Sequence, residues 1–275
     1  MNPLFAVLLG LVQGVSEWLP ISSKTQVLIA STFLFSLPLA VAYAFGLFME
    51  IGSLGSAITY FRRDIWSLLK DRKLLLYLLV VTITTGIVGV PLYYLTDKVL
   101  TSNPYNVGIP MILLGLVLTG TGLYIRYART KPRLIGGLKD LKLKNYVIVG
   151  IAQGIAALPG VSRSGMTVST MLLMGVKPEQ AFRLSYLAYI PASLGAFFVT
   201  LIFSRSQVDA AITAVEPTGV LIAILTAAVI GIFVISYLLK FSKTGRIYLV
   251  HFVLGAVALI IGIMTTILAQ HASAS

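Results

Sequence analysis

The chain has 275 residues, of which 57% are hydrophobic and 11% are charged, and it contains no cysteine. A soluble domain does not need so much apolar surface, so the composition excludes a soluble enzyme and indicates a polytopic helical membrane protein. Without cysteine, disulfides and thiolate metal sites are excluded as well. The formal net charge of +12 does not indicate a nucleic-acid partner, because the basic residues lie in short loops between apolar segments.

Six apolar segments are each long enough to cross a bilayer, which takes about 20 helical residues. They lie at 39–61, 74–94, 107–125, 181–203, 217–239 and 247–268. Two further apolar segments, 3–35 and 146–178, are interrupted by proline and polar residues. Irregular backbone at membrane depth is tolerated only where protein or water covers it, so we expect two broken or re-entrant helical hairpins. The predicted fold class is an all-α polytopic membrane protein.

Loop charge predicts how the chain is oriented. Lys and Arg are abundant in 62–73, 126–145 and 240–246, whereas 95–106 contains only Lys98 and 204–216 only Arg205. Cytoplasmic loops are enriched in basic residues, so the first three loops are predicted to lie inside and the other two outside. If each hairpin returns to the side it came from, both termini lie outside a multi-pass protein of the cell membrane.

The two hairpins carry the same small and polar residues in the same order, at a separation of about 140 positions. The matched residues are Gly10, Gln13, Gly14, Leu19, Pro20, Ser23 and Lys24 in the first hairpin, and Gly150, Gln153, Gly154, Leu158, Pro159, Ser162 and Arg163 in the second. According to the loop charges, span 39–61 crosses the membrane from outside to inside, whereas its counterpart 181–203 crosses from inside to outside. We therefore predict an inverted repeat of 1–135 and 136–275 within one membrane domain, with the site between the interrupted segments.

The first hairpin places a carboxylate inside apolar sequence. Gln13 and Glu17 are four residues apart, so they share one face of a helix. A carboxylate at membrane depth is by default functional and paired, and Lys24 and Arg163 are the natural partners. A protonated structural carboxyl is the alternative for Glu17. Further polar candidates in the same stretch are Ser22, Ser23, Lys24 and Thr25.

The residues from 157 to 167 combine a Pro-Gly break with hydroxyl groups and one arginine. Serine hydroxyls, freed backbone N–H groups and a guanidinium fork together suit a phosphate group. Arg163 in an apolar run should line a polar cavity, although a kinked helix from which it snorkels is the alternative. The candidate ligands here are Gly160, Ser162, Arg163, Ser164 and Thr167.

Two ionisable residues within the spans are less clearly functional. Glu50 lies beside Ser53-Leu54-Gly55, which recurs as Ser193-Leu194-Gly195, and either faces the same cavity or has a structural role. Arg183 lies near the predicted cytoplasmic end of span 181–203. It either binds the substrate or snorkels to the interface.

At these residues the sequence resembles the undecaprenyl-pyrophosphate phosphatase (bacitracin-resistance) family of integral-membrane enzymes. The family's (Glu/Gln)-x-x-x-Glu motif is matched by Gln13 and Glu17, and its Pro-Gly-x-Ser-Arg-Ser-x-x-Thr motif is matched in full over 159–167. The second motif is highly specific, whereas the first is weak alone. The resemblance covers essentially the whole chain. It implies hydrolysis of a polyprenyl diphosphate to the monophosphate carrier lipid, with phosphate released at the outer face.

Our leading hypothesis is phosphoryl transfer at a site formed by both hairpins. The expected catalytic residues are Glu17, Arg163, Ser162, Ser22 and Ser23, and the expected substrate-binding residues are Gln13, Lys24, Thr25, Gly160, Ser164, Thr167, Glu50 and Arg183. Arg163 would stabilise charge in the transition state. Glu17 would act as a general base or bind a divalent cation, for which the resemblance implies Mg²⁺. A serine nucleophile and direct attack by water both stay open.

The expected partners are the polyprenyl diphosphate and the membrane lipids, with a homodimer left open. Two departures from the family pattern bear on activity. Gln26 stands where the family has a histidine, and glutamine cannot exchange a proton near neutral pH. Gly46 stands where the family has an acidic residue. The rival hypothesis is therefore a transporter or flippase for polyprenyl phosphate or another anionic lipid, which inverted repeats with broken helices would also suit.

Overall fold

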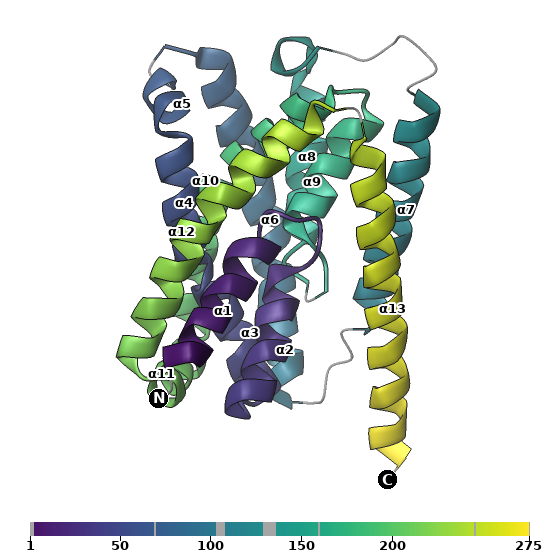
Figure 1. Cartoon of the computed structure of the whole chain (residues 1–275). Coiled ribbons are helices and arrows are strands. Elements are labelled where there is room, and N and C mark those ends of the chain that lie inside the picture. Colours follow the sequence, from purple (N-terminus) through teal and green to yellow (C-terminus); the bar gives the residue numbers. More distant parts are fainter. Residues whose placement is uncertain are drawn as a thin grey trace.

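The computed structural model describes residues 3–68, 70–102, 108–128, 136–158, 160–244 and 246–274. Over these ranges the chain is built of helices and contains no β-strand (Figure 1). Among the described residues, five helical stretches are long and apolar enough to cross a membrane, namely Ala40–Tyr60, Arg72–Lys98, Pro178–Phe203, Pro217–Ser242 and Tyr248–Ile267. The remaining predicted span, 107–125, corresponds to helix α7, Gly108–Ala128. The predicted all-α polytopic membrane fold is confirmed.

Both interrupted segments are pairs of short helices. They are α1, Pro3–Ser16, with α2, Ser23–Phe35, and α8, Leu143–Ile155, with α9, Arg163–Leu173. The longest of the four has 14 residues, which is shorter than the about 20 residues that cross a bilayer. The connecting turns, 17–22 and 156–162, lie at mid-height of the bundle (Figure 1). Each pair therefore turns back inside the molecule, and Pro159 of the second turn lies outside the described residues.

The span predicted at 39–61 is divided in the structure. Helix α3 covers Leu39–Phe48 and helix α4 covers Glu50–Tyr60, with Met49 between them. Glu50 is therefore the first residue of α4. The start of a helix is the positive end of its dipole and favours an acidic residue.

The remaining helices run along the bundle or lie at its ends. They are α5, Arg62–Ser67, α6, Arg72–Ser102, α10, Pro178–Phe203, α11, Arg205–Val215, α12, Pro217–Ser242, and α13, Ile247–Ala274, with a 3-10 turn at Leu138–Asp140. Helix α11 occupies a segment that the charge pattern treats as a loop. Its buried residues Val208, Ala211 and Val215 recur at helical spacing. This amphipathic face packs against α3, which explains why the segment is helical.

The repeated glycines allow two pairs of helices to approach closely. Helix α1 packs against α12, and helix α8 packs against α6. A Cβ at Gly10 would lie 2.5 Å from the Ala223 carbonyl oxygen, and one at Gly150 would lie 2.6 Å from the Thr84 Cβ. Small residues commonly permit such contacts between membrane helices. The matched pairs are those an inverted repeat would produce. The division into repeats at 1–135 and 136–275 stays a prediction, and residues 129–135 at its boundary lie outside the described residues.

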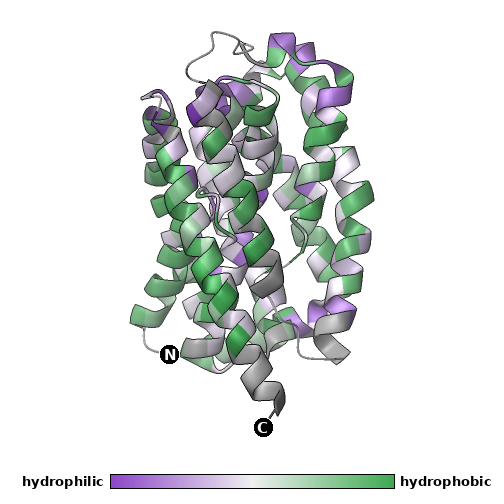
Figure 2. Cartoon of the chain, turned by 90° about the vertical axis from the view of Figure 1, so that its right-hand side faces the viewer, coloured by the Kyte–Doolittle hydropathy of each residue, from purple (hydrophilic) through white to green (hydrophobic). Residues whose placement is uncertain are grey.

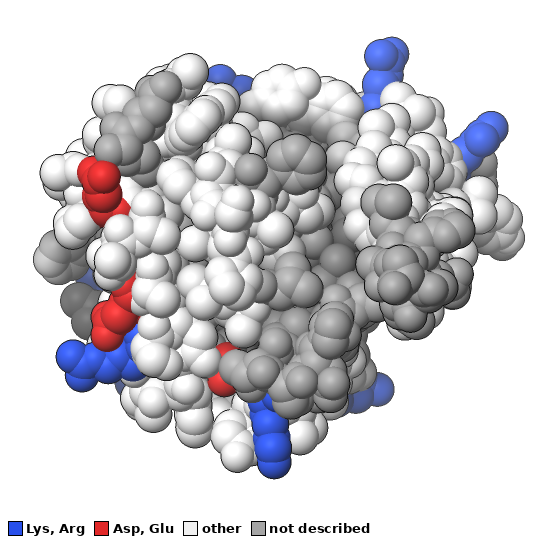
Figure 3. Space-filling model, turned by 90° about the horizontal axis from the view of Figure 1, so that it is seen from below, with Lys and Arg blue, Asp and Glu red and all other residues white. Residues whose placement is uncertain are grey.

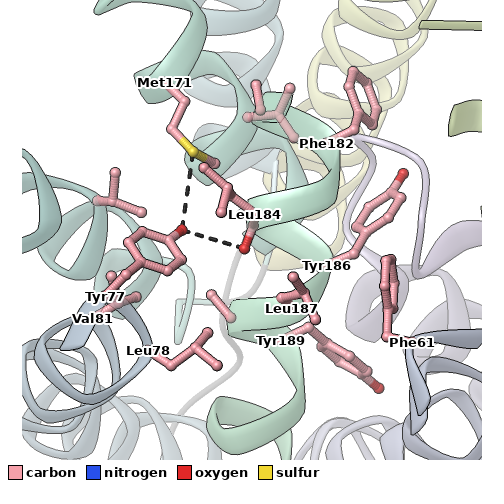
Figure 4. Packing of buried hydrophobic residues seen from close by; sticks show 14 of the residues in the cluster. Phe61, Tyr77, Leu78, Val81, Met171, Phe182, Leu184, Tyr186, Leu187 and Tyr189 are labelled. Atoms are coloured by element: carbon pink, nitrogen blue, oxygen red, sulfur yellow. Dashed lines mark hydrogen bonds between the residues drawn. The ribbon is translucent and has the colours of Figure 1, made fainter. Parts of the chain in front are cut away.

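The main hydrophobic cluster joins α4, α6, α8, α9, α10 and α12. The Tyr77 hydroxyl donates to the Leu184 carbonyl oxygen over 3.3 Å and lies 4.0 Å from the Met171 sulfur (Figure 4). Trp18, in the turn of the first hairpin, packs edge-on against Tyr186 and Tyr189, with ring centroids 5.0 Å apart in both pairs. These contacts hold the first hairpin against α10.

The two ends of the bundle differ. Both termini lie at one end and α5 lies at the other (Figure 1). Figure 2 shows hydrophobic residues along the outward faces of the long helices and many hydrophilic residues at the ends. At the end that carries the termini, the described residues in the middle of the face are uncharged, and Lys, Arg, Asp and Glu lie around its edge (Figure 3). The predicted sidedness of these ends rests on loop charge.

Candidate active site

The turn of each hairpin is bonded to the other hairpin's second helix. The Gly160 N–H donates to the Thr25 hydroxyl over 2.7 Å, and the Ser164 hydroxyl donates to the Leu19 carbonyl oxygen over 2.8 Å. Gly160 has a φ of 83°, a left-handed conformation that glycine adopts without strain. The starts of α2 and α9 are therefore fixed beside each other in the interior.

Glu17 is the centre of the polar cluster between the hairpins. One carboxylate oxygen pairs with the guanidinium of Arg163. The other accepts from the Gln13 amide over 2.7 Å and from the Ser23 hydroxyl over 2.8 Å. The Glu17 side chain is only 3% exposed, so these partners replace the water that the charge loses. The structure thus brings together residues from α1, α2 and α9.

The Arg163 guanidinium is held in place and still has donor capacity. Its Cζ lies 3.6 Å from the centroid of the Tyr189 ring, a cation–π contact. The Tyr189 hydroxyl donates to the backbone carbonyl of Glu50 over 2.8 Å. Within the described part of the chain, the buried Arg163 Nη1 has no hydrogen-bond partner, whereas Nη2 binds Glu17. A bound anion could therefore take the second arm of the fork.

Lys24 and Glu50 complete the charged cluster. The Lys24 ammonium donates to the Ala156 carbonyl of the second hairpin. A small cavity of about 10 Å³ is lined by both residues together with Glu17 and Arg163. Glu50 is 4% exposed and Lys24 is 6% exposed. With two basic and two acidic residues in this cavity, the formal charges cancel, so an added phosphate needs further positive charge.

The other predicted hydroxyl groups mainly support the local backbone. Ser162 accepts from the Gly165 N–H over 3.1 Å and so caps the start of α9. Ser22 accepts from the Thr25 hydroxyl over 3.0 Å. Thr167 donates to the Arg163 carbonyl oxygen over 2.9 Å and faces the packing between helices. Three serines, Ser22, Ser23 and Ser162, were predicted to be catalytic. Among the described residues, Ser23 is the one of these three whose hydroxyl is hydrogen-bonded to Glu17.

Arg183 does not belong to this cluster, contrary to its prediction as a substrate-binding residue. Its guanidinium pairs with Asp64 of α5, and its side chain is 46% exposed. Arg183 lies in the first turns of α10 and contacts α5 through Asp64, whereas Glu17, Lys24 and Glu50 of the cluster are buried. The ion pair joins the two halves of the chain at the surface.

Two functional contacts were not expected from the sequence. Tyr189 lies under the Arg163 guanidinium, and Ser53 accepts from the Gln13 amide over 3.1 Å. An aromatic residue in an apolar span gives no sign that its ring faces a cation, because packing alone explains it. Ser53 does belong to the repeated Ser-Leu-Gly, which was the available signal.

The structure gives a reason for Gly46, one of the two departures from the family pattern. A Cβ at Gly46 would lie 3.1 Å from the Lys24 carbonyl oxygen, because α3 passes close to the start of α2. A larger side chain there requires the Lys24 backbone to shift. Gln26 is half-buried in the first turn of α2, one turn after Ser22.

A second, larger cavity adjoins the charged cluster. Its volume is about 180 Å³, and it lies between α6, α10 and the turn of the second hairpin. Lys24, Glu50 and Arg163 line both cavities. The apolar residues that line the larger one include Leu47, Val90, Tyr93, Ala157, Pro191 and Val199. This chamber is therefore charged at one end and mostly apolar elsewhere.

Comparison with known proteins agrees with this arrangement. The family model described as bacitracin resistance protein BacA matches residues 6–264. An undecaprenyl-diphosphatase of Sulfurisphaera tokodaii is 56% identical, over 98% of this chain and 100% of the relative. Proteins of the same name from Saccharolobus islandicus and Pyrobaculum aerophilum are 53% and 40% identical, over 98% and 95% of this chain and 100% and 98% of theirs. This chain is a member of the bacitracin resistance protein BacA family.

Proposed function

We propose that this chain is an integral-membrane phosphatase that hydrolyses an undecaprenyl-type polyprenyl diphosphate to the monophosphate and inorganic phosphate, and so recycles the carrier lipid. The observation that carries the proposal is the buried Arg163–Glu17–Lys24–Glu50 cluster at the charged end of an apolar chamber. A polyprenyl diphosphate has the same division between a charged head and an apolar tail. The names of the relatives support the same reaction.

Arg163 and two helix starts supply the electrostatic part of the reaction. Phosphoryl transfer spreads charge over the non-bridging oxygens, and its catalysis comes mainly from positioning and charge stabilisation. The unpartnered Nη1 of Arg163 is a donor for one of these oxygens. Helices α2 and α9 both begin at the cluster, at Ser23 and Arg163, and helix N-termini favour bound phosphate.

Glu17 and Ser23 have the relation of a general base and a nucleophile. The Ser23 hydroxyl already donates to Glu17 over 2.8 Å, which is within the reach required for proton transfer. In this mechanism Ser23 Oγ attacks the terminal phosphorus, its proton passes to Glu17, and the bond to the bridging oxygen breaks to release polyprenyl monophosphate. Water then hydrolyses the phosphoserine and releases phosphate. Trapping a phosphoenzyme that is absent from Ser23→Ala tests this step against direct attack by water.

The two buried carboxylates also fit a magnesium ion. No group of three or more His, Asp or Glu that could hold a metal occurs in the described part of the chain. Mg²⁺ is nevertheless commonly bound by one or two carboxylates together with substrate phosphates. Glu17 and Glu50, which line one cavity, would hold the ion. When bound, it would neutralise phosphate charge that Lys24 and Arg163, already balanced by these carboxylates, leave uncompensated.

Phosphate release from undecaprenyl diphosphate by the purified, monodisperse protein tests the proposal. We expect release by the wild type, and release that is at least about a hundredfold slower by Glu17→Gln prepared in the same way. If the wild type binds the lipid phosphate but releases no phosphate from the diphosphate, a transporter or flippase replaces the phosphatase.

The proposed orientation has the active site open to the outer face of the cell membrane. Loop charge supports it, and both termini lie at the end opposite α5. Single cysteines can be introduced without background in this cysteine-free chain. A membrane-impermeant reagent added to intact cells should label Lys98→Cys and spare Lys139→Cys. If Lys139→Cys is labelled and Lys98→Cys is not, the orientation of the protein is opposite to the one proposed.

A further inference from the structure

We propose that the lipid tail of the substrate passes through a lateral window between α6 and α10, and that Gly86 and Gly195 keep this window open. The inference rests on the proposed function and identifies residues that would determine which prenyl chain lengths are accepted. Both glycines line the larger chamber, one from each helix. No other part of the reaction has been assigned to them.

Two contacts hold α6 and α10 together, one on each side of the stretch that contains Gly86 and Gly195. Toward the α5 end of the bundle, the Tyr77 hydroxyl of α6 donates to the Leu184 carbonyl oxygen of α10 (Figure 4). Toward the end with the termini, the Tyr93 and Ser204 hydroxyls lie 2.6 Å apart. The chamber meets both helices between these two contacts, because Gly86 and Gly195 lie within the interval.

The two glycines stand at the border between the chamber and the lipid-facing surface. On α6, Val90 one turn after Gly86 lines the chamber, whereas the adjacent Ile87 is 69% exposed. On α10, Val199 one turn after Gly195 lines the chamber, whereas Phe198 is 54% exposed. A helix position between a chamber-facing and a lipid-facing residue lies where the cavity reaches the surface.

Close helix packing does not explain these glycines. A Cβ at Gly86 or at Gly195 would meet no heavy atom within 4 Å. This differs from Gly10 and Gly150, where a Cβ would collide with the neighbouring helix. Glycine inside a helix is less favourable than alanine. What the absent side chains provide here is free space in the chamber wall.

The chamber is suited to a tail that is joined to an anionic head. Arg163 and Lys24 lie at its charged end, and Arg163 has an unpartnered buried donor. Gln153, which is 2% exposed and lines the chamber, has an amide oxygen without a hydrogen-bond partner among the described residues. The polar atoms left for a ligand therefore lie beside an apolar passage. An undecaprenyl tail is much longer than the chamber, so most of it must lie in the bilayer.

The test compares a long and a short substrate on variants that fill the window. Gly86→Leu and Gly195→Leu would place a branched apolar side chain in the passage without altering the charged cluster. We expect each to lower kcat/KM for undecaprenyl diphosphate by about tenfold or more, which is the scale on which apolar pockets discriminate added bulk. Farnesyl diphosphate, whose tail is short, should be affected several-fold less, and Gly195→Ala should have a smaller effect than Gly195→Leu.

Gly120→Leu is the matched control. A Cβ at Gly120 of α7 also meets nothing within 4 Å, but Gly120 does not line the chamber. The same substitution there should leave both substrates unaffected. The window proposal is wrong if both window variants hydrolyse the long substrate as fast as the wild type. It is also wrong if kcat/KM falls equally for the long and the short substrate. In either case the wild type still hydrolyses the diphosphates, so the phosphatase proposal survives. If the wild type hydrolyses neither substrate, the phosphatase proposal itself fails.

Discussion

The two hairpins share a backbone plan but differ in the chemistry that they contribute. In each, a short helix ends at a turn and a second helix begins at the cluster, with a basic residue in its first turn, Lys24 in α2 and Arg163 in α9. Each basic side chain reaches across to the other hairpin. Arg163 pairs with the carboxylate of Glu17, whereas Lys24 donates a hydrogen bond to the backbone carbonyl of Ala156.

This difference separates the frame of the site from its reactive groups. Ala156 occupies the position in the second hairpin that corresponds to Glu17 when Lys24 is matched with Arg163. The second hairpin therefore has no counterpart to the carboxylate that binds Ser23. In the proposed mechanism, the first hairpin supplies the proton chemistry and the second supplies the main phosphate donor. Substitutions at corresponding positions can test that division.

The largest effect is expected from Glu17→Gln. Glutamine keeps the shape and a hydrogen bond but cannot accept a proton. Loss of general base catalysis typically lowers a rate by about 10² to 10⁴-fold. Initial rates of phosphate release should fall on this scale, while size-exclusion chromatography shows a folded protein. Substantial turnover by Glu17→Gln would rule out Glu17 as the base.

Arg163→Lys should have the next largest effect. Lysine keeps the positive charge but loses the planar fork that can bind Glu17 and a phosphate oxygen together. Loss of a transition-state donor typically lowers kcat by about 10² to 10³-fold. The reciprocal Lys24→Arg should be milder, because Lys24 contacts a neutral carbonyl. Wild-type rates in Arg163→Lys would show that this residue is structural.

Glu50→Gln tests the proposed contribution of the first half to cation binding. Glu50 lines the same cavity as Glu17, and Mg²⁺ binding weakens when a carboxylate is lost. We expect the Mg²⁺ concentration for half-maximal activity to rise about tenfold, a typical loss of affinity on altering a metal site. An unchanged Mg²⁺ titration, with EDTA abolishing activity in both proteins, would place the cation elsewhere.

The sequence predicted the frame well because its signals are local. The long apolar runs, the Pro-Gly interruption and the repeated glycines can each be read without knowledge of distant contacts. The expected proximity of Glu17 and Arg163 depended on the repeat and on the cost of charges in a membrane. Their contact in the structure joins residues 146 positions apart.

What could not be predicted depends on the direction of side chains in the folded molecule. Tyr189 and Arg183 both belong to α10, and one lies under the Arg163 guanidinium whereas the other pairs with Asp64 at the surface. The sequence places both residues in the same span but does not determine which faces the site. The same applies to Glu50, whose environment depends on how α3 and α4 pack.

A smaller effect should distinguish the corresponding residues Gln13 and Gln153. Gln13 donates to Glu17 over 2.7 Å, whereas Gln153 donates to the Thr85 hydroxyl over 3.0 Å. Gln13→Ala should lower kcat by about tenfold through a less well-positioned base, a scale typical of supporting residues. Gln153→Ala should change kcat less. Equal losses would show that both glutamines serve only helix packing.

The smallest effect is expected at Gln26, which stands where the family pattern has a histidine. Glutamine has no proton to exchange near neutrality, so the wild-type pH–rate profile should contain no histidine ionisation. Gln26→His would add an imidazole, whose pKa in water is about 6.5. Gln26 is half-buried in the first turn of α2, one turn from Ser22, and the family resemblance implies that a histidine at this position assists catalysis. We expect activity to be preserved or increased, with a new limb in the profile that His251→Gln does not remove. Loss of activity in a folded Gln26→His protein would show that this site has adapted to work without histidine, with Glu17 carrying the proton chemistry alone.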